Sequence, residues 1–149
     1  MEWIMLFIFN WIIFLLLADW KEFKINMWAG VAGIVLAVVV DFLNTLQHRY
    51  IIKSLVIDVF GSSLFFLLGP VFVVATLMAQ YHPARRWMIP LNVFVIALLY
   101  SLMELILVYR GVVEYINWRY IDSIMVNIGA IVILSWFSMV VLNKKMERS

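Results

Sequence analysis

The sequence contains no cysteine among its 149 residues, and only 13% of them are charged. The absence of cysteine excludes a disulfide framework, a thiol nucleophile and any zinc or iron–sulfur centre held by cysteine. An ordinary soluble domain carries about twice this share of charged residues. With a net charge of only +2, the chain also lacks the basic patch that phosphate binding requires, so we expect no nucleic-acid partner.

Hydrophobic residues, in contrast, make up 66% of the chain, and they are gathered in long runs. Five runs approach or exceed the ~20 residues that a helix needs to cross the hydrocarbon core of a bilayer. They cover residues 3–20, 27–43, 54–80, 88–109 and 123–142. The sequence therefore predicts an all-α membrane protein with five transmembrane helices in a compact bundle. Since the connections are short, residues 1–149 form one polytopic membrane domain with the lipid bilayer as its surroundings.

Two segments are expected to depart from straight helices joined by plain loops. The third run contains Gly69-Pro70, and proline removes a backbone hydrogen bond, so we expect a kink or a strong tilt there. The connection over residues 110–122 mixes apolar and charged side chains. This mixture predicts a short amphipathic turn or helix along the membrane interface.

The distribution of lysine and arginine predicts the orientation of the bundle. Cytoplasmic loops of membrane proteins carry the excess of these residues. Four of the eleven lie on the side of the N-terminus, and they are Arg49, Lys53, Arg110 and Arg119; the other seven are Lys21, Lys24, Arg85, Arg86, Lys144, Lys145 and Arg148. This bias favours an external N-terminus and a cytoplasmic C-terminus.

Acidic residues inside the predicted spans are the best candidates for a functional site. An ionisable side chain within a span costs roughly 2.5–3.5 kcal/mol, so each needs a partner, an interior position or a use. Asp41, Asp58, Glu104 and Asp122 all fall toward the outer ends of their spans. Because small and polar residues share their helix faces, we expect these acids to face other helices.

The pattern predicts a polar vestibule that opens outward and binds a cation, a proton or a small solute. Two or three carboxylates at short range would coordinate a positive ion or share a proton. The predicted site contains the four acids together with three polar neighbours on the same faces, namely Ser62, Ser101 and Asn127. No metal ligand set and no cofactor are predicted, because the two histidines lie in connections on opposite sides.

An alternative interpretation needs no site at all for the three aspartates. Each lies about a turn from the end of its span, where it could pair with Lys53, Arg49 or Arg119 at the interface. Glu104 differs, since Arg110 follows it by about 9 Å along the helix axis and on another face. Both interpretations stay open for the three aspartates. The functional interpretation depends mainly on Glu104, because placing this acid inside a span is costly.

Catalytic motifs are absent from the sequence. There is no His-Glu-x-x-His pattern, and Gly61-Ser62-Ser63 lacks the flanking glycines of a nucleophile elbow and a nearby histidine. We therefore expect a protein that is not an enzyme. A lipid-modifying enzyme ranks third among the functions considered.

The C-terminal half, over residues 69–136, resembles an uncharacterised family of small multi-pass membrane proteins from endospore-forming Gram-positive bacteria. The shared features are Gly69-Pro70, Tyr81-His82-Pro83, Glu104, Gly111, Glu114-Tyr115, Asn117-Trp118 and a final apolar helix that begins near Ser123. Glu104 and Trp118 match the family's pattern best, whereas Asp41 and Asp58 have no counterpart in it. The resemblance implies a bacterial plasma membrane and assigns no activity.

The leading functional hypothesis is a small membrane protein whose outward-facing acidic site binds or transports a cation or small solute, alone or as a homo-oligomer. The alternative is an accessory or scaffold subunit. In that case the small-residue faces of its helices would dock onto other membrane subunits in a larger complex.

Overall fold

The computed structural model describes residues 2–47, 49–52, 58–59, 62–81 and 87–141. Within them the fold is helical, with only short strands in the connections. The helices are α1 (Glu2–Leu17), α2 (Phe23–Leu46), α3 (Leu64–Phe66), the π-helix η1 (Leu67–Val71), α4 (Phe72–Gln80), α5 (Met88–Tyr109) and α6 (Tyr120–Val140). Because α3, η1 and α4 follow one another without a break, the described residues form five helical rods. The all-α prediction is confirmed.

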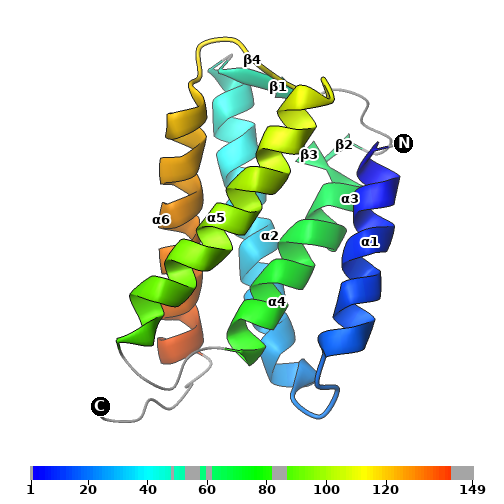
Figure 1. The fold of residues 1–149 in the computed structure, drawn as a ribbon, viewed down its shortest axis with the longest axis vertical. Coiled ribbons are helices and arrows are strands. Elements are labelled where there is room, and N and C mark those ends of the chain that lie inside the picture. Colours follow the sequence, from blue (N-terminus) through cyan, green and yellow to red (C-terminus); the bar gives the residue numbers. More distant parts are fainter. Residues whose placement is uncertain (1, 48, 53–57, 60–61, 82–86, 142–149) are drawn as a thin grey trace.

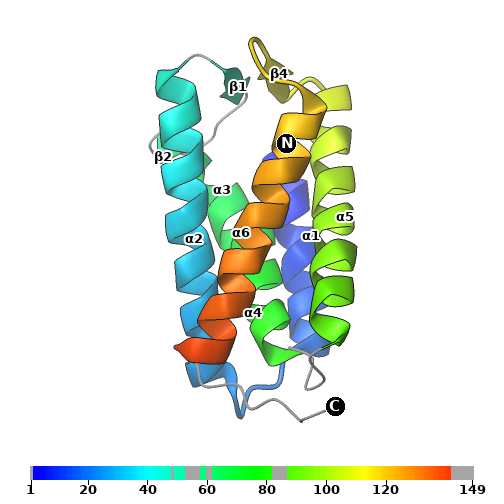
Figure 2. The same ribbon diagram turned by 90° about the vertical axis from the view of Figure 1, so that its left-hand side faces the viewer.

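The rods run alternately up and down (Figure 1). We call the end that carries the strands β1 and β4 the upper end of the bundle, and the opposite end the lower end. α1, the α3–α4 rod and α6 run from the upper toward the lower end, and α2 and α5 run the other way. After a turn of 90°, α6 lies between α2 and α5 (Figure 2), and it packs against both. α6 begins beside α5 at the upper end and approaches α2 toward the lower end (Figure 2).

The third rod begins later than the sequence predicts. α3 starts at Leu64, whereas Asp58 lies in strand β2 (Asp58–Val59) and Ser62 in strand β3 (Ser62–Ser63). These two strands pair with each other in antiparallel register. The prediction of a helix at Asp58 and Ser62 was therefore wrong, because a short apolar run rich in valine and isoleucine can form either a strand or a helix.

The Gly69-Pro70 pair, where the sequence predicts a kink or a strong tilt, lies in an irregular stretch of the third rod. The helix widens there into the π-helix η1 (Leu67–Val71), which accommodates the hydrogen bond that proline cannot donate. Gly69 also faces α1, because a Cβ atom at this position would lie 2.9 Å from the Cα atom of Phe7. The missing side chain thus allows the third rod to approach the backbone of α1.

The connection between α5 and α6 contains a turn at Arg110 and Gly111 and then a strand, so of the two predicted forms, a turn or a helix, the helix was wrong. Strand β4 (Val113–Tyr115) pairs in antiparallel register with strand β1 (Tyr50–Ile52). Gly111, with a φ angle of 80°, ends α5 in a left-handed conformation that glycine adopts easily. The β-branched and aromatic residues that follow then favour an extended chain.

The tightest glycine packing joins α2 to α4. A Cβ atom on Gly30 would lie 2.4 Å from Thr76 Oγ1, and one on Gly33 would lie 2.8 Å from Ala75 Cβ. Both separations are shorter than non-bonded atoms tolerate, so glycine is needed for the two helices to come this close. The small-residue face of α2 therefore packs inside the bundle.

Large apolar side chains cover the outside of the bundle. Among the described residues, more than 60% of the surface is exposed in Phe9, Leu16, Phe94, Leu99, Ile106 and Met125. Three helical segments, Phe23–Asn44, Met88–Tyr109 and Tyr120–Val140, are long and apolar enough to cross a membrane. Two shorter apolar helices cover Trp3–Leu17 and Leu64–Gln80.

Candidate functional site

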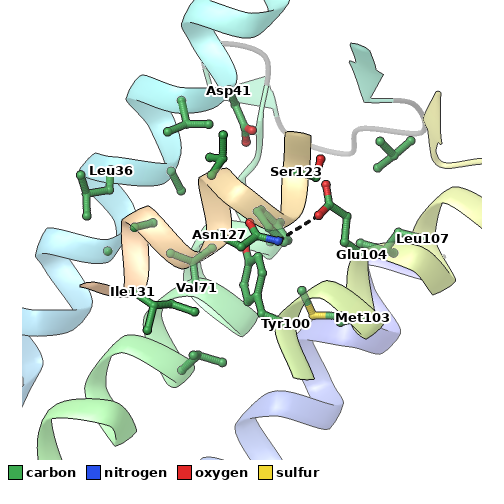
Figure 3. Close-up of a pocket in the computed structure, with 18 of the residues that line it drawn as sticks. Leu36, Asp41, Val71, Tyr100, Met103, Glu104, Leu107, Ser123, Asn127 and Ile131 are labelled. Atoms are coloured by element: carbon green, nitrogen blue, oxygen red, sulfur yellow. Dashed lines mark hydrogen bonds between the residues drawn. The ribbon is translucent and has the colours of Figure 1, made fainter. Parts of the chain in front are cut away.

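Glu104 lies on α5 near the upper end and accepts hydrogen bonds on both carboxyl oxygens. Tyr115 of β4 donates from its hydroxyl group to Oε1 at 3.1 Å. Asn127 of α6 donates from Nδ2 to Oε2 at 3.1 Å (Figure 3). Within the described part of the chain, Glu104 thus has two neutral hydrogen-bond donors from two other elements. These donors take the place of the arginine that an ion pair would need.

Ser101 holds the same two helices together one turn below Glu104. Its hydroxyl oxygen accepts a second hydrogen bond from Asn127 Nδ2, at 3.2 Å. Its backbone oxygen accepts a hydrogen bond of 2.5 Å from the hydroxyl group of Tyr120, in the first turn of α6. Ser101 is buried, and these contacts fix the position of α6 relative to the acidic residue on α5.

A chain of hydrogen bonds leads from Trp118 to Glu104. Trp118 Nε1 donates to Ser123 Oγ. Ser123 Oγ and the Tyr115 hydroxyl oxygen are 3.3 Å apart, and Tyr115 in turn donates to Glu104. Since each hydroxyl group has one hydrogen, and that of Tyr115 points to Glu104, Ser123 donates to Tyr115. Trp118 and Glu104 thus lie at opposite ends of one chain of hydrogen bonds.

Asp41 lies on α2 and has its own tyrosine partner. The hydroxyl group of Tyr50, the first residue of β1, donates to Asp41 Oδ1 at 2.6 Å. The Asp41 side chain is 9% exposed and that of Tyr50 is 7% exposed. A buried hydrogen bond to a carboxylate is among the stronger polar contacts in proteins, so it ties β1 firmly to α2.

Arg49 connects the strand region to the start of α6. Its guanidinium carbon lies 5.5 Å from the centre of the Trp118 ring, a cation–π contact. Its backbone oxygen accepts hydrogen bonds from the backbone nitrogens of Ile116 at 2.9 Å and Asn117 at 3.1 Å. These contacts extend the β1–β4 pairing and hold Trp118 above the polar residues.

The two carboxylates line one cavity of about 130 Å³ inside the bundle. Asp41 enters it from α2, Glu104 from α5 and Asn127 from α6, with the amide of Asn127 beside Glu104 (Figure 3). Tyr50, Tyr100, Trp118 and Ser123 also line the cavity, and the rest of the wall is almost entirely apolar.

The structure brings together only part of the predicted site. Asp41, Glu104 and Asn127 line the cavity, and Ser101 lies behind it as the hydrogen-bond partner of Asn127. Asp122 does not line the cavity. The side chains of Asp58 and Ser62 lie outside the described part of the structure, so their place in the site stays a prediction.

Asp122 instead fits the interfacial interpretation. Its Oδ2 accepts a hydrogen bond of 3.0 Å from the backbone nitrogen of Arg119, the residue at the start of α6. Its Oδ1 lies 3.5 Å from the Arg119 guanidinium group. A carboxylate in the first turn satisfies an otherwise unpaired backbone N–H group and interacts favourably with the helix dipole.

Sequence reasoning missed the two tyrosines that bind the carboxylates, Tyr50 and Tyr115. Neither is among the residues predicted for the site. The signal that could have found them is the β-branched and aromatic run around each one, at 50–52 and 112–116, which is typical of strands. Burial raises the pKa of both phenols, and the neighbouring carboxylates, Asp41 at Tyr50 and Glu104 at Tyr115, raise it further.

The arrangement places two acidic side chains, Asp41 and Glu104, in the wall of one cavity. In the part of the chain that the structure describes, no three histidine, aspartate or glutamate side chains are grouped to hold a metal ion.

Comparison of the chain with protein-family models, with curated proteins and with solved structures finds no match. The resemblance to the endospore-former family therefore stays a prediction that rests on its sequence motifs.

Proposed function

We propose that this chain is an integral membrane protein whose five rods all cross the bilayer. The apolar outer surface supports this proposal, because exposed side chains of this kind are stable in lipid and not in water. The three longer helices have the length that a bilayer requires. The two shorter ones pack beside them along the same axis, so they would cross with the others or leave a gap in the bundle.

The upper end of the bundle, with the acidic cavity, would face outward. The excess of lysine and arginine on the opposite side supports this orientation. Since the chain has no native cysteine, single-cysteine variants can test it directly. We expect Asn117→Cys at the upper end to react with an impermeant thiol reagent on intact cells, and Lys21→Cys at the lower end to react only after lysis. The reverse pattern would turn the cavity toward the cytoplasm.

The function that the geometry supports best is the binding of a cation or small solute in this cavity. The observation that carries the proposal is that Asp41 and Glu104, from different helices, line one cavity in an otherwise apolar bundle. Two carboxylates in such surroundings are expensive, and a bound positive charge would offset that cost. The hydrogen bonds from Tyr50, Tyr115 and Asn127 hold both groups in place before a ligand arrives.

Thermal unfolding of the purified protein in a neutral detergent tests this function. A ligand that binds only the folded state, present at a hundred times its Kd, adds about 2.7 kcal/mol of stability. We expect at least one member of a panel of inorganic cations and small organic amines to stabilise the wild type, and Glu104→Gln to lose the response. Asp122→Asn is the matched control, since it changes an acid at the same end outside the cavity. If no member of the panel stabilises the wild type, the proposed function is wrong.

The alternative of an accessory subunit has less support. It was based on small-residue faces that would be free to dock on other helices. In α2, Gly30 and Gly33 pack against Thr76 and Ala75 of the same chain, so this face is already occupied.

A further inference from the structure

The cavity has one polar end and one apolar end. Asp41, Glu104, Tyr50 and Asn127 line it near the upper end of the bundle. Gly33 lies eight residues before Asp41 on α2, and Leu134 lies seven residues after Asn127 on α6, and both also line the cavity. At 1.5 Å per residue, the wall continues for about 10–12 Å below the polar groups.

The lower part of this wall is apolar on every helix that contributes to it. Leu36 of α2, Val71 of η1, Ala75 of α4 and Ile131 of α6 lie there (Figure 3). An engineered apolar cavity of about 150 Å³ in another protein binds benzene, so the volume of about 130 Å³ here suits a body of about the same size. A hydrophobic ligand body would gain free energy by leaving water for this space.

A bare inorganic cation fits such a space poorly. Ca²⁺ takes six to eight oxygen ligands, and Mg²⁺ keeps several of its water molecules when it binds. The cavity offers two carboxylates, and each already accepts a hydrogen bond from a tyrosine. A hydrated ion would also need polar surroundings, whereas most of this wall is made of aliphatic side chains.

An ammonium group matches the polar end. It has donors and no acceptor, and each carboxylate has about four lone-pair sites, of which Tyr115 and Asn127 use two at Glu104. The rings of Tyr50, Tyr100 and Trp118 also line the cavity. Aromatic faces attract cations, and this attraction grows when the cation has left water.

We infer that the cavity binds an organic ammonium ion with an apolar body about as large as a benzene ring, the ammonium group lying between Asp41 and Glu104 and the body lying toward Leu36 and Ile131. This inference rests on the proposed function, because it names the chemical class of the ligand for the same site. The two carboxylates select the charge, and the apolar end selects the size.

The test compares benzylammonium with benzyl alcohol, which has nearly the same shape and no charge, and with NaCl, KCl and CaCl₂. Isothermal titration calorimetry on the full chain in a neutral detergent measures each affinity. We expect one benzylammonium per chain, bound at least ten times more tightly than benzyl alcohol. Glu104→Gln and Asp41→Asn should each weaken benzylammonium binding by tenfold or more, and Asp122→Asn should leave it within a factor of two.

A variant at the apolar end tests the second half of the inference without touching the acids. Ala130 lines the cavity, so Ala130→Leu would fill part of the space for the ligand body. We expect this variant to weaken benzylammonium binding by tenfold or more and to leave binding of the plain ammonium ion unchanged. This comparison also remains available if an acidic variant fails to fold.

The outcomes separate the inference from the proposed function. Binding of an inorganic cation without binding of benzylammonium would overturn the inference and leave a cation site in place. Equal binding of benzylammonium and benzyl alcohol, unaffected by Glu104→Gln, would overturn the inference and the role of the carboxylates. Binding of none of these ligands would overturn both.

Discussion

Tyr50 and Tyr115 lie directly opposite each other in the β1–β4 pair, and each donates a hydrogen bond to a different acidic side chain. Tyr50 binds Asp41 of α2 at 2.6 Å, and Tyr115 binds Glu104 of α5 at 3.1 Å. Side chains at directly opposed positions of an antiparallel pair point to the same face of the sheet. A short sheet at the upper end thus connects two helices through their carboxylates.

Removing either phenol hydroxyl group should therefore destabilise the bundle. Hydrogen bonds to charged groups contribute about 1.5–3 kcal/mol, so we expect Tyr50→Phe and Tyr115→Phe each to lower the free energy of unfolding by about that amount. The double variant should lose less than the sum, because the first change already loosens the sheet. Denaturant titration in detergent measures the three values.

Tyr109→Phe provides the control for these two variants. Tyr109 ends α5 and is 90% exposed, so we expect its change to alter the free energy of unfolding by less than about 0.5 kcal/mol. If Tyr50→Phe and Tyr115→Phe change the free energy of unfolding as little as Tyr109→Phe does, the hydrogen bonds of the two tyrosines contribute nothing to stability.

A second prediction concerns the packing of α2 against α4. Gly33→Leu would place a bulky side chain where a Cβ atom alone already lies 2.8 Å from Ala75 Cβ, so we expect misassembly or a large loss of thermal stability. Gly129→Leu on α6 is the control, because a Cβ atom there meets nothing within 4 Å. The control should be neutral or slightly stabilising, since glycine is a poor helix former. If the two variants had the same thermal stability, the face of α2 that contains Gly33 would lie outside the bundle.

Asp122 is expected to affect stability without affecting the cavity. Asp122→Ala removes the acceptor for the backbone N–H group of Arg119 at the start of α6, which should lower the thermal stability slightly. Ligand binding should stay at the wild-type level, because Asp122 does not line the cavity. If Asp122→Ala lost the stabilisation that a cation gives the wild type, Asp122 would belong to the binding site.

Alkaline pH provides a test of the buried phenol of Tyr50, whose pKa is raised above its ordinary value of 10.0. Below pH 10.0 the phenol is neutral in the folded and the unfolded chain, so it adds no pH dependence there. Above that pH the unfolded chain loses the proton while the folded chain keeps it, and stability falls by up to about 1.4 kcal/mol per pH unit. We expect Tyr50→Phe to reduce this alkaline loss, as measured by denaturant titration.

The sequence predicts the helices well where apolar runs have polar ends. α5 begins at Met88 and ends at Tyr109, as predicted, because Arg85 and Arg86 precede the run and Arg110 follows it. The start of the third rod could not be found in this way. There the apolar run continues through residues that form strands, and hydrophobicity alone does not distinguish the two structures.

The site was predictable where its residues share a helix face, and not where strands bring them together. The spacing of Ser101 and Glu104 places both on one side of α5, and Asn127 meets them from α6. The pairing of Tyr50 with Tyr115 joins two connections that are far apart in the sequence. Neither connection alone indicates which segment it will pair with, so the tyrosine partners of the acids required the structure.

The rods differ in length, and this difference has a consequence for the lipid around them. α5 has 22 residues and extends for about 33 Å, whereas α1 has 16 residues and extends for about 24 Å. α1 and α3 both begin below the level at which α5 ends (Figure 1). A bilayer of about 30 Å would match the hydrophobic length of α5 and exceed that of α1. The membrane would then have to thin on the α1 side, so bilayers of short acyl chains would hold this bundle with less deformation than thick ones.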